Sequence, residues 1–182
     1  MMKTLARHRT GSILMAILLS AAGAGCAGNH PPIEPVPYVD LERFMGDWYV
    51  IASIPTFLEK GAHNAVESYA LNEDGSIATT FEFRKDGFDG KRKTYTPTGF
   101  VTDTDSNAVW GMRFIWPIKA DYRIAYLDEE YSQTVIARNK RDFVWLMART
   151  PAISESDYAE LVELIESLGY DIAKLRKVPQ QW

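Results

Sequence analysis

The chain has 182 residues, a single cysteine and a formal net charge of −4. This length favours one folded domain, and one cysteine excludes both an internal disulfide and a zinc site built from several thiolates. The acidic balance is unlike that of an electrostatic nucleic-acid binder, so no nucleic-acid partner is expected.

Residues 1–25 have the layout of a secretory signal peptide. Lys3, Arg7 and Arg9 precede an apolar run over residues 13–19, and small residues fill positions 20–25. The run is shorter than the roughly 20 apolar residues that a membrane-spanning helix needs. We therefore expect this segment to be cleaved from the mature protein.

Cys26 follows the leader directly and resembles the cysteine of the bacterial lipobox, which is lipidated after signal cleavage. Gly23 departs from that pattern, which usually has leucine there, and a leftover cysteine in an ordinary signal is the alternative. The next residue is Ala27 and not Asp, which resembles the signal that sends lipoproteins to the outer membrane in enteric bacteria. The expectation is a lipid anchor at Cys26 in the cell outer membrane, with a periplasmic domain held stably by the acyl chains.

Residues 26–39 contain four prolines, at positions 31, 32, 35 and 37. This composition predicts an extended tether between membrane and domain. The folded domain is then expected to span residues 40–182.

Short segments of alternating polarity separated by turn signals follow in the domain. Residues 77–84, 108–114 and 122–127 alternate clearly, and 133–139 and 143–149 are rich in strand-forming residues. Strands at roughly ten-residue spacing predict an all-β antiparallel meander, either closed as a barrel or stacked as a sandwich.

One helix is predicted over about 154–168. Ser154 begins a capping sequence, five apolar residues from Tyr158 to Leu168 share one face, and Gly169 suits the C-terminal cap. The helix should pack on the outside of the sheet, on Val144, Leu146 and Ala148, which alternate with Phe143, Trp145, Met147 and Arg149 on the inward side.

Three segments in order resemble the motifs of the lipocalin family. They are Gly46-Asp47-Trp48 at the start of a strand, residues 121–131, and residues 145–151 with Arg149. The resemblance is closest to the bacterial outer-membrane lipoprotein lipocalins, with an apolipoprotein D-like branch further away. It implies an eight-stranded antiparallel up-and-down β-barrel with one C-terminal α-helix packed outside. Gly46, Trp48 and Arg149 would be the structural signature of the family, with Trp48 and Arg149 in contact at the closed end.

An eight-stranded barrel has an interior that side chains fill or that holds one small ligand. By alternation, ten inward side chains are candidate ligand-binding residues: Phe81, Phe83, Trp110, Met112, Phe114, Tyr122, Ile124, Tyr126, Trp145 and Met147. For each of them, core filling is the alternative. The alternation does not decide whether Glu67 faces inward.

No catalytic constellation, metal site or cofactor motif is recognisable, and His63 has no partner histidine, so an enzyme is not expected. The resemblance implies a membrane-anchored protein that holds a fatty acid or lysophospholipid in the barrel for envelope lipid storage, transport or repair. The alternative is a filled barrel that acts as a protein-interaction or homodimerisation module through Trp116, Ile118 and the tail 179–182.

Overall fold

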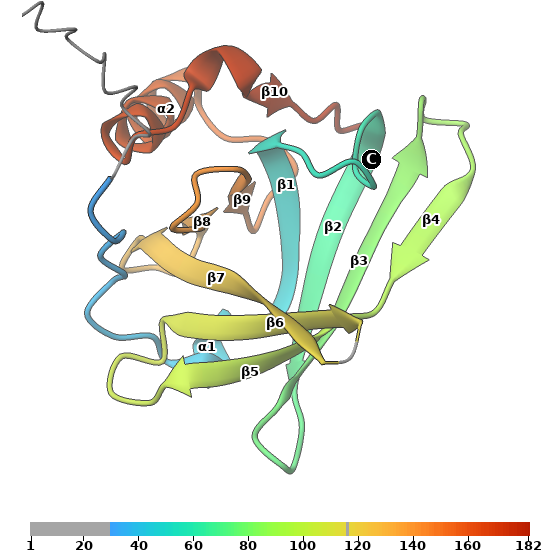
Figure 1. Cartoon of the computed structure of the whole chain (residues 1–182). Coiled ribbons are helices and arrows are strands. Elements are labelled where there is room, and N and C mark those ends of the chain that lie inside the picture. The colour runs from blue at the N-terminus through green and yellow to red at the C-terminus, as the bar shows by residue number, and fades with distance from the viewer. Residues whose placement is uncertain (1–29, 116) are drawn as a thin grey trace, which may run out of the picture.

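The computed structural model describes residues 30–115 and 117–182, apart from the side chain of Ile115. The expected signal peptide, the lipid attachment at Cys26 and the proposed contact residue Trp116 lie outside these residues. The strands are β1 Gly46–Ile54, β2 Ala62–Leu71, β3 Ile77–Lys85, β4 Arg92–Tyr95, β5 Thr98–Asp103, β6 Val109–Ile115, β7 Ile118–Leu127, β8 Gln133–Ala137, β9 Val144–Ala148 and β10 Arg176–Lys177. The helices are α1 Leu41–Phe44 and α2 Glu155–Ser167, with a short 3₁₀ helix Ile172–Lys174 (Figure 1).

Eight strands close into an antiparallel barrel, which confirms the expected fold. The hydrogen-bonded order is β1-β2-β3-β5-β6-β7-β8-β9, and β9 returns to β1 with Tyr49 opposite Ala148 and Ile54 opposite Val144. β4 and β5 pair with successive parts of β3. They form one strand interrupted at Thr96-Pro97, because proline cannot donate a ladder hydrogen bond.

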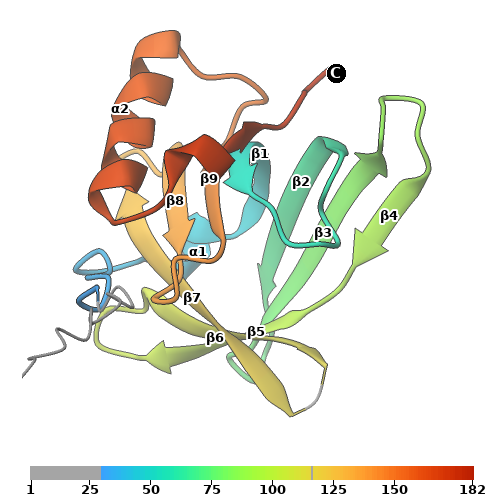
Figure 2. The same ribbon diagram turned by 45° about the horizontal axis from the view of Figure 1, so that its top comes forward.

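Helix α2 packs against the outside of the barrel, as expected (Figure 2). Ser154 caps it by accepting a hydrogen bond from the Asp157 amide at 3.0 Å, and Gly169 follows with a φ of +92°. Leu161 and Ile165 are buried together with the predicted outward set of β9: Val144, Leu146 and Ala148. A second apolar cluster fills the barrel interior and includes Met147, the inward neighbour on that strand.

The proline-rich segment is extended but does not hang free as a tether. Ile33 and Val39 are buried and Val36 packs on the inner cluster. The spacing of three residues equals the repeat of a polyproline-type chain, in which every third side chain would lie on the same side. The tether expectation is therefore wrong for residues 33–39, because the segment carries its own apolar face and docks on the barrel wall.

The C-terminal tail covers the place where β1 and β2 diverge. β10 pairs with the end of β1, through Ala52 opposite Lys177. The Gln180 amide then donates to the carbonyls of Val50 at 2.8 Å and Ala65 at 3.2 Å, one on each strand. The tail is thus part of the barrel wall.

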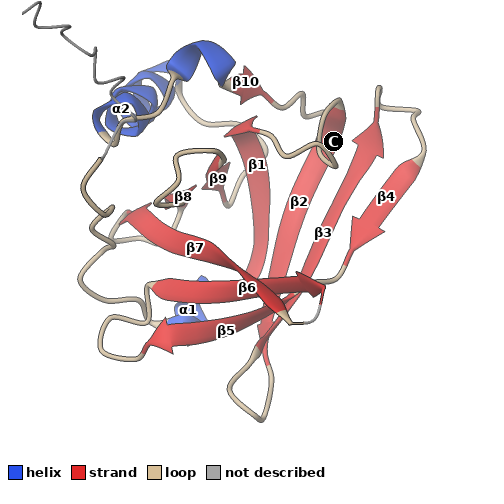
Figure 3. Ribbon diagram, viewed as in Figure 1, coloured by secondary structure: helices blue, strands red, loops and turns tan. Residues whose placement is uncertain are grey.

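The strand connections define two ends of the barrel (Figure 3). We call the end formed by segments 55–61, 85–92, 113–119 (in which Trp116 is not described) and 138–143 the open end. The end formed by segments 40–47, 72–76, 102–107 and 128–132 is the closed end. Among the residues described here, no helix is long and apolar enough to cross a membrane.

Candidate ligand-binding cavity

Arg149 seals the closed end by lying across Trp48. Its guanidinium carbon is 3.9 Å from the centre of the indole ring, and its Nη atoms donate to the carbonyls of Arg43, Phe44 and Asp47 at 2.8–3.0 Å. Gly46 adopts a φ of +93°, and a side chain there would approach Arg149 to 3.4 Å. The structure thus brings together Trp48 and Arg149, as the resemblance implied, and places Gly46 of the same signature beside them.

A layer of aromatic side chains fills the barrel above this seal. Trp110 stacks on Tyr122 with ring centres 5.0 Å apart and planes 7° apart, and Phe44 meets Trp110 edge to face at 5.5 Å. The hydroxyls of Tyr69 and Tyr122 lie 2.6 Å apart. Burial raises the pKa of both phenols well above its ordinary value, so both stay protonated. This layer forms the floor of the space above it.

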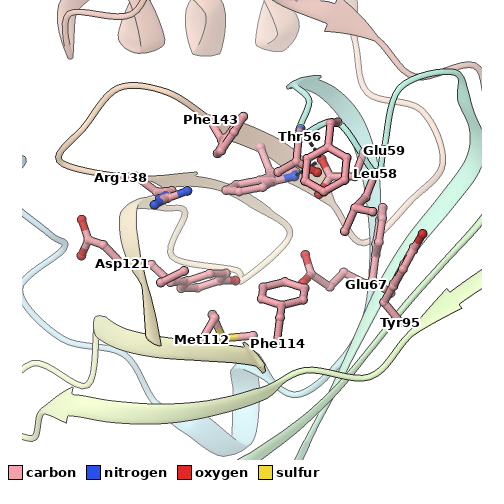
Figure 4. Close-up of a pocket in the computed structure, with 15 residues that line it drawn as sticks. Thr56, Leu58, Glu59, Glu67, Tyr95, Met112, Phe114, Asp121, Arg138 and Phe143 are labelled. Atoms are coloured by element: carbon pink, nitrogen blue, oxygen red, sulfur yellow. Dashed lines mark hydrogen bonds between the residues drawn. The ribbon is translucent and has the colours of Figure 1, made fainter. Parts of the chain in front are cut away.

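A cavity of about 300 Å³ lies between this floor and the open end (Figure 4). It is small for a ligand site but within the range that such sites occupy. Its lining is mostly apolar and comes from β2, β3, β4, β6, β7, β9 and the loops at the open end: Thr56, Phe57, Leu58, Glu59, Glu67, Phe81, Tyr95, Met112, Phe114, Ala120, Asp121, Tyr122, Arg138, Phe143 and Trp145.

The ten predicted inward residues divide into three groups. Five line the cavity: Phe81, Met112, Phe114, Tyr122 and Trp145. Four belong to the inner cluster without lining the cavity: Phe83, Trp110, Ile124 and Met147. For these four the structure shows the alternative that the sequence left open, namely core filling.

Tyr126, the tenth residue, was wrongly expected to face inward. It packs instead with the outer cluster beneath α2, whereas Leu127 packs on the inner cluster. The register of β7 against β8 shifts between Ile124 and Tyr126. Such a bulge adds one residue to a strand and reverses the side-chain alternation beyond it, so a pattern that held through Ile124 failed at Tyr126.

Two glutamates give the cavity its main polar character. Glu67, which the sequence left unplaced, lies on the inner face of β2 and points toward the Phe114 ring (Figure 4). Burial raises the pKa of Glu67 to about 8, with the Tyr69 side chain opposing this rise and the charge of Glu59 adding to it. At neutral pH this carboxyl is therefore mostly protonated and can donate a hydrogen bond.

Glu59 lies nearer the open end, where the β1–β2 loop folds over the cavity. Its Oε2 accepts from the Trp145 indole at 3.1 Å and from the Thr56 amide at 3.2 Å. Burial raises the pKa of Glu59, and these hydrogen bonds oppose the rise. Trp145 is thereby fixed as one wall of the cavity.

Arg138 brings the one positive charge among the cavity-lining residues. Its Nη1 is 3.5 Å from Asp142, and its buried Nε has no hydrogen-bond partner within the described part of the chain. Asp121, on the same side, pairs with Arg123 at 3.1 Å and accepts from the Asn139 amide. The guanidinium of Arg138 is therefore the lining group best able to receive an anionic headgroup.

The polar lining residues Glu59, Asp121 and Arg138 were not predicted from the sequence. Glu59 and Arg138 lie in connections, where no alternation exists to reveal their direction. The alternation of Ala65, Glu67 and Tyr69 on one face of β2 was the signal that could have placed Glu67. Across the described residues, no group of three or more His, Cys, Asp or Glu side chains is placed to hold a metal ion.

Comparison with known proteins gives concordant matches. A family model described as a lipocalin-like domain matches residues 39–180. The chain is 34% identical to temperature-induced lipocalin-1 of Arabidopsis thaliana, over 81% of this chain and 83% of that protein. It is 26% identical to outer membrane lipoprotein Blc of Escherichia coli, over 92% of this chain and 97% of that protein.

Solved structures show the same fold. Insecticyanin from the tobacco hornworm Manduca sexta superposes with a TM-score of 0.63 at 12% identity, over 81% of this chain and 84% of that one. Apocrustacyanin A1 from lobster superposes with a TM-score of 0.61 at 10% identity, over 78% of this chain and 79% of that one. At such low identity these likenesses concern the fold alone.

Proposed function

The chain belongs to the lipocalin family, and we propose that it holds one fatty acid or lysophospholipid in the barrel cavity while anchored to the outer membrane by lipid at Cys26. Its likeness to outer membrane lipoprotein Blc over 92% of the chain supports the location. The observation that carries the proposal is an apolar cavity, closed below by aromatic residues, whose few polar groups include Arg138 near the open end.

The cavity suits an acyl chain with a polar head. Phe81, Met112 and Trp145 offer apolar contact to the chain, and burial of each CH₂ group contributes about 0.8 kcal/mol. The Nε of Arg138, which has no partner among the described residues, offers a charge-assisted hydrogen bond to a carboxylate or phosphate. Protonated Glu67 can donate to a carbonyl or ester oxygen deeper in the cavity.

The binding test uses tryptophan fluorescence, because Trp145, one of the five tryptophans of the chain, lines the cavity. Titration with a long-chain fatty acid or a lysophospholipid should change the emission saturably, with one ligand bound for each chain. Native mass spectrometry of protein extracted without delipidation should show an acyl lipid as the occupant.

A matched pair of variants locates the site. Phe114→Glu places a carboxylate on the cavity wall at a side chain that is already 55% exposed, so the fold should survive and binding should weaken at least tenfold. Tyr38→Glu, at a side chain 60% exposed and away from the cavity lining, should bind as the parent does. Absence of saturable binding by the folded parent chain would contradict the proposal and favour the interaction or dimerisation module, which measurement of the oligomeric state would then test.

A further inference from the structure

We propose that the open end of the barrel docks on an anionic membrane surface, so that the cavity mouth faces the bilayer that supplies its lipid. The proposal rests on the proposed anchor at Cys26 and the proposed lipid ligand. Three features of the molecule support it: the path of the N-terminal segment, the distribution of charge between the two ends, and the apolar residues exposed around the mouth.

The N-terminal segment runs along the barrel wall from the open end to the closed end. The Val39 amide donates to Ser106 at the closed end. Nearer the N-terminus, the Ile33 amide donates to Asn139 at 2.8 Å, and Arg141 donates to the Pro31 carbonyl at 2.6 Å. Since segment 138–143 belongs to the open end, the described chain begins beside that end.

Chain length then fixes how far the anchor lies from the mouth. Cys26 precedes His30 by four residues, which span at most about 14 Å when fully extended. The closed end lies further away by the height of the barrel, roughly 20–25 Å for tilted strands of this length. A lipid on Cys26 therefore holds the open end, and not the closed end, next to the bilayer.

The charges of the two ends are opposite. The open-end segments contain nine Lys or Arg against four Asp or Glu, whereas the closed-end segments contain ten acidic residues and one Arg. Each of the four open-end segments carries one exposed lysine: Lys60, Lys91, Lys119 and Lys140. Each basic residue brought close to an anionic leaflet raises the affinity for the membrane about fivefold. The same surface repels the acidic closed end.

Apolar side chains are exposed in three of the segments that carry these lysines. Phe57 is 78% and Ile118 is 69% exposed, and Phe88 and Phe114 are also partly open to solvent at the same end. Aromatic and aliphatic residues interleaved with lysines are typical of segments that enter the headgroup region of a bilayer. Phe57 and Phe114 also line the cavity, so the lipid-contacting rim is continuous with the binding site.

The orientation can be measured with single thiol labels on the acylated chain in vesicles. Ile118→Cys places a label at the open end, and Leu71→Cys places a matched label at an apolar side chain, 42% exposed, at the closed end of β2. The vesicles contain phosphatidylglycerol and phosphatidylethanolamine, with spin-labelled lipid as the membrane quencher and iodide as the aqueous quencher. The Ile118 label should be quenched by the lipid and shielded from iodide, and the Leu71 label should behave in the opposite way.

A charge variant and the parent chain complete the test. Lys91→Gln with Lys140→Gln, in the Ile118→Cys chain, should reduce quenching by the lipid several-fold, as should high salt. Equal access of iodide to the Ile118 and Leu71 labels would overturn the proposal. The parent chain should not react with a thiol dye, because acylated Cys26 has no free thiol. Reaction at Cys26 would show that the residue carries no lipid, and this would overturn the proposal. The lipid titration of the cavity would stand separately in either case.

Discussion

Arg149 connects three separate parts of the closed end through its guanidinium. Besides the carbonyls of Arg43, Phe44 and Asp47, it reaches the Tyr131 carbonyl through Nε at 3.2 Å. These acceptors belong to α1, to the start of β1 and to the β7–β8 turn, the last of which is distant from the other two in sequence. The planar five-donor group of arginine suits such a junction in a way that lysine does not.

Replacing Arg149 should therefore reduce stability more than ligand binding. Arg149→Ala removes charge-assisted hydrogen bonds and the contact with Trp48, and should cost about 2–3 kcal/mol, or roughly 5–10 °C in Tm. Arg149→Lys should recover only part of this loss. Thermal unfolding measures the effect, and lipid titration below the transition should give the parent affinity. An unaltered Tm for Arg149→Ala would contradict the structural role.

Glu67 makes stability depend on pH with a definite sign. Its pKa is about 8 in the folded chain against an ordinary value of 4.5, so the folded state binds the extra proton between these two values. Stability contributed by this residue is greatest below pH 4.5, falls as the pH rises, and levels off above about 8. Ionised Glu67 should also repel an anionic ligand over the same range.

The variant Glu67→Gln should remove this pH dependence because glutamine stays neutral. At pH 9 we expect its free energy of unfolding to exceed that of the parent by about 1–2 kcal/mol; this value allows for screening of the charge by water in the cavity. Near pH 4 the two chains should be equally stable. Its affinity for a fatty acid should change little between pH 7 and 9, whereas that of the parent should fall. Urea unfolding and lipid titration at several pH values measure both effects. Glu163→Gln, on the exposed face of α2, should follow the parent throughout.

At the scale of the elements, regular patterns proved predictable and their interruptions did not. Helix α2 was predicted within one residue at each end because its cap, its apolar face and Gly169 all agree. The direction of Tyr126 was wrong because the bulge in β7 depends on its pairing with β8, which is a tertiary property. The division of one strand into β4 and β5 and the packing of β10 on β1 were likewise not predicted.

The same distinction applies to the cavity. Side chains on regular strands, such as Phe81 and Met112, could be assigned to the interior by alternation. Residues that reach the cavity from connections, such as Phe57, Glu59 and Arg138, could not be, because their direction depends on how each loop folds over the mouth. Alternation also cannot distinguish residues that line a cavity from residues that fill the core. The sequence therefore left both roles possible for Trp110 and Met147.

At the scale of the whole molecule, the N-terminal segment is part of the fold. With one cysteine in the chain, cohesion comes from packing and hydrogen bonds, and not from an internal disulfide. Residues 33–39 bind the barrel along its full height, between Asn139 at the open end and Ser106 at the closed end. This attachment would also transmit the position of the proposed anchor at Cys26 to the barrel, because a free tether would leave the orientation of the barrel unconstrained.

Weakening that attachment should therefore destabilise the whole barrel, and not merely release the segment. Val39 is fully buried within the inner cluster, so Val39→Ala should cost about 2 kcal/mol through lost burial and the cavity that it leaves. Urea unfolding followed by tryptophan fluorescence should show a single transition at a lower midpoint, with an unchanged slope. Glu34→Ala, at an exposed position of the same segment, should unfold with the parent. If Val39→Ala also unfolded with the parent, residues 33–39 would be a tether lying on the barrel, and the folded domain would begin at Asp40.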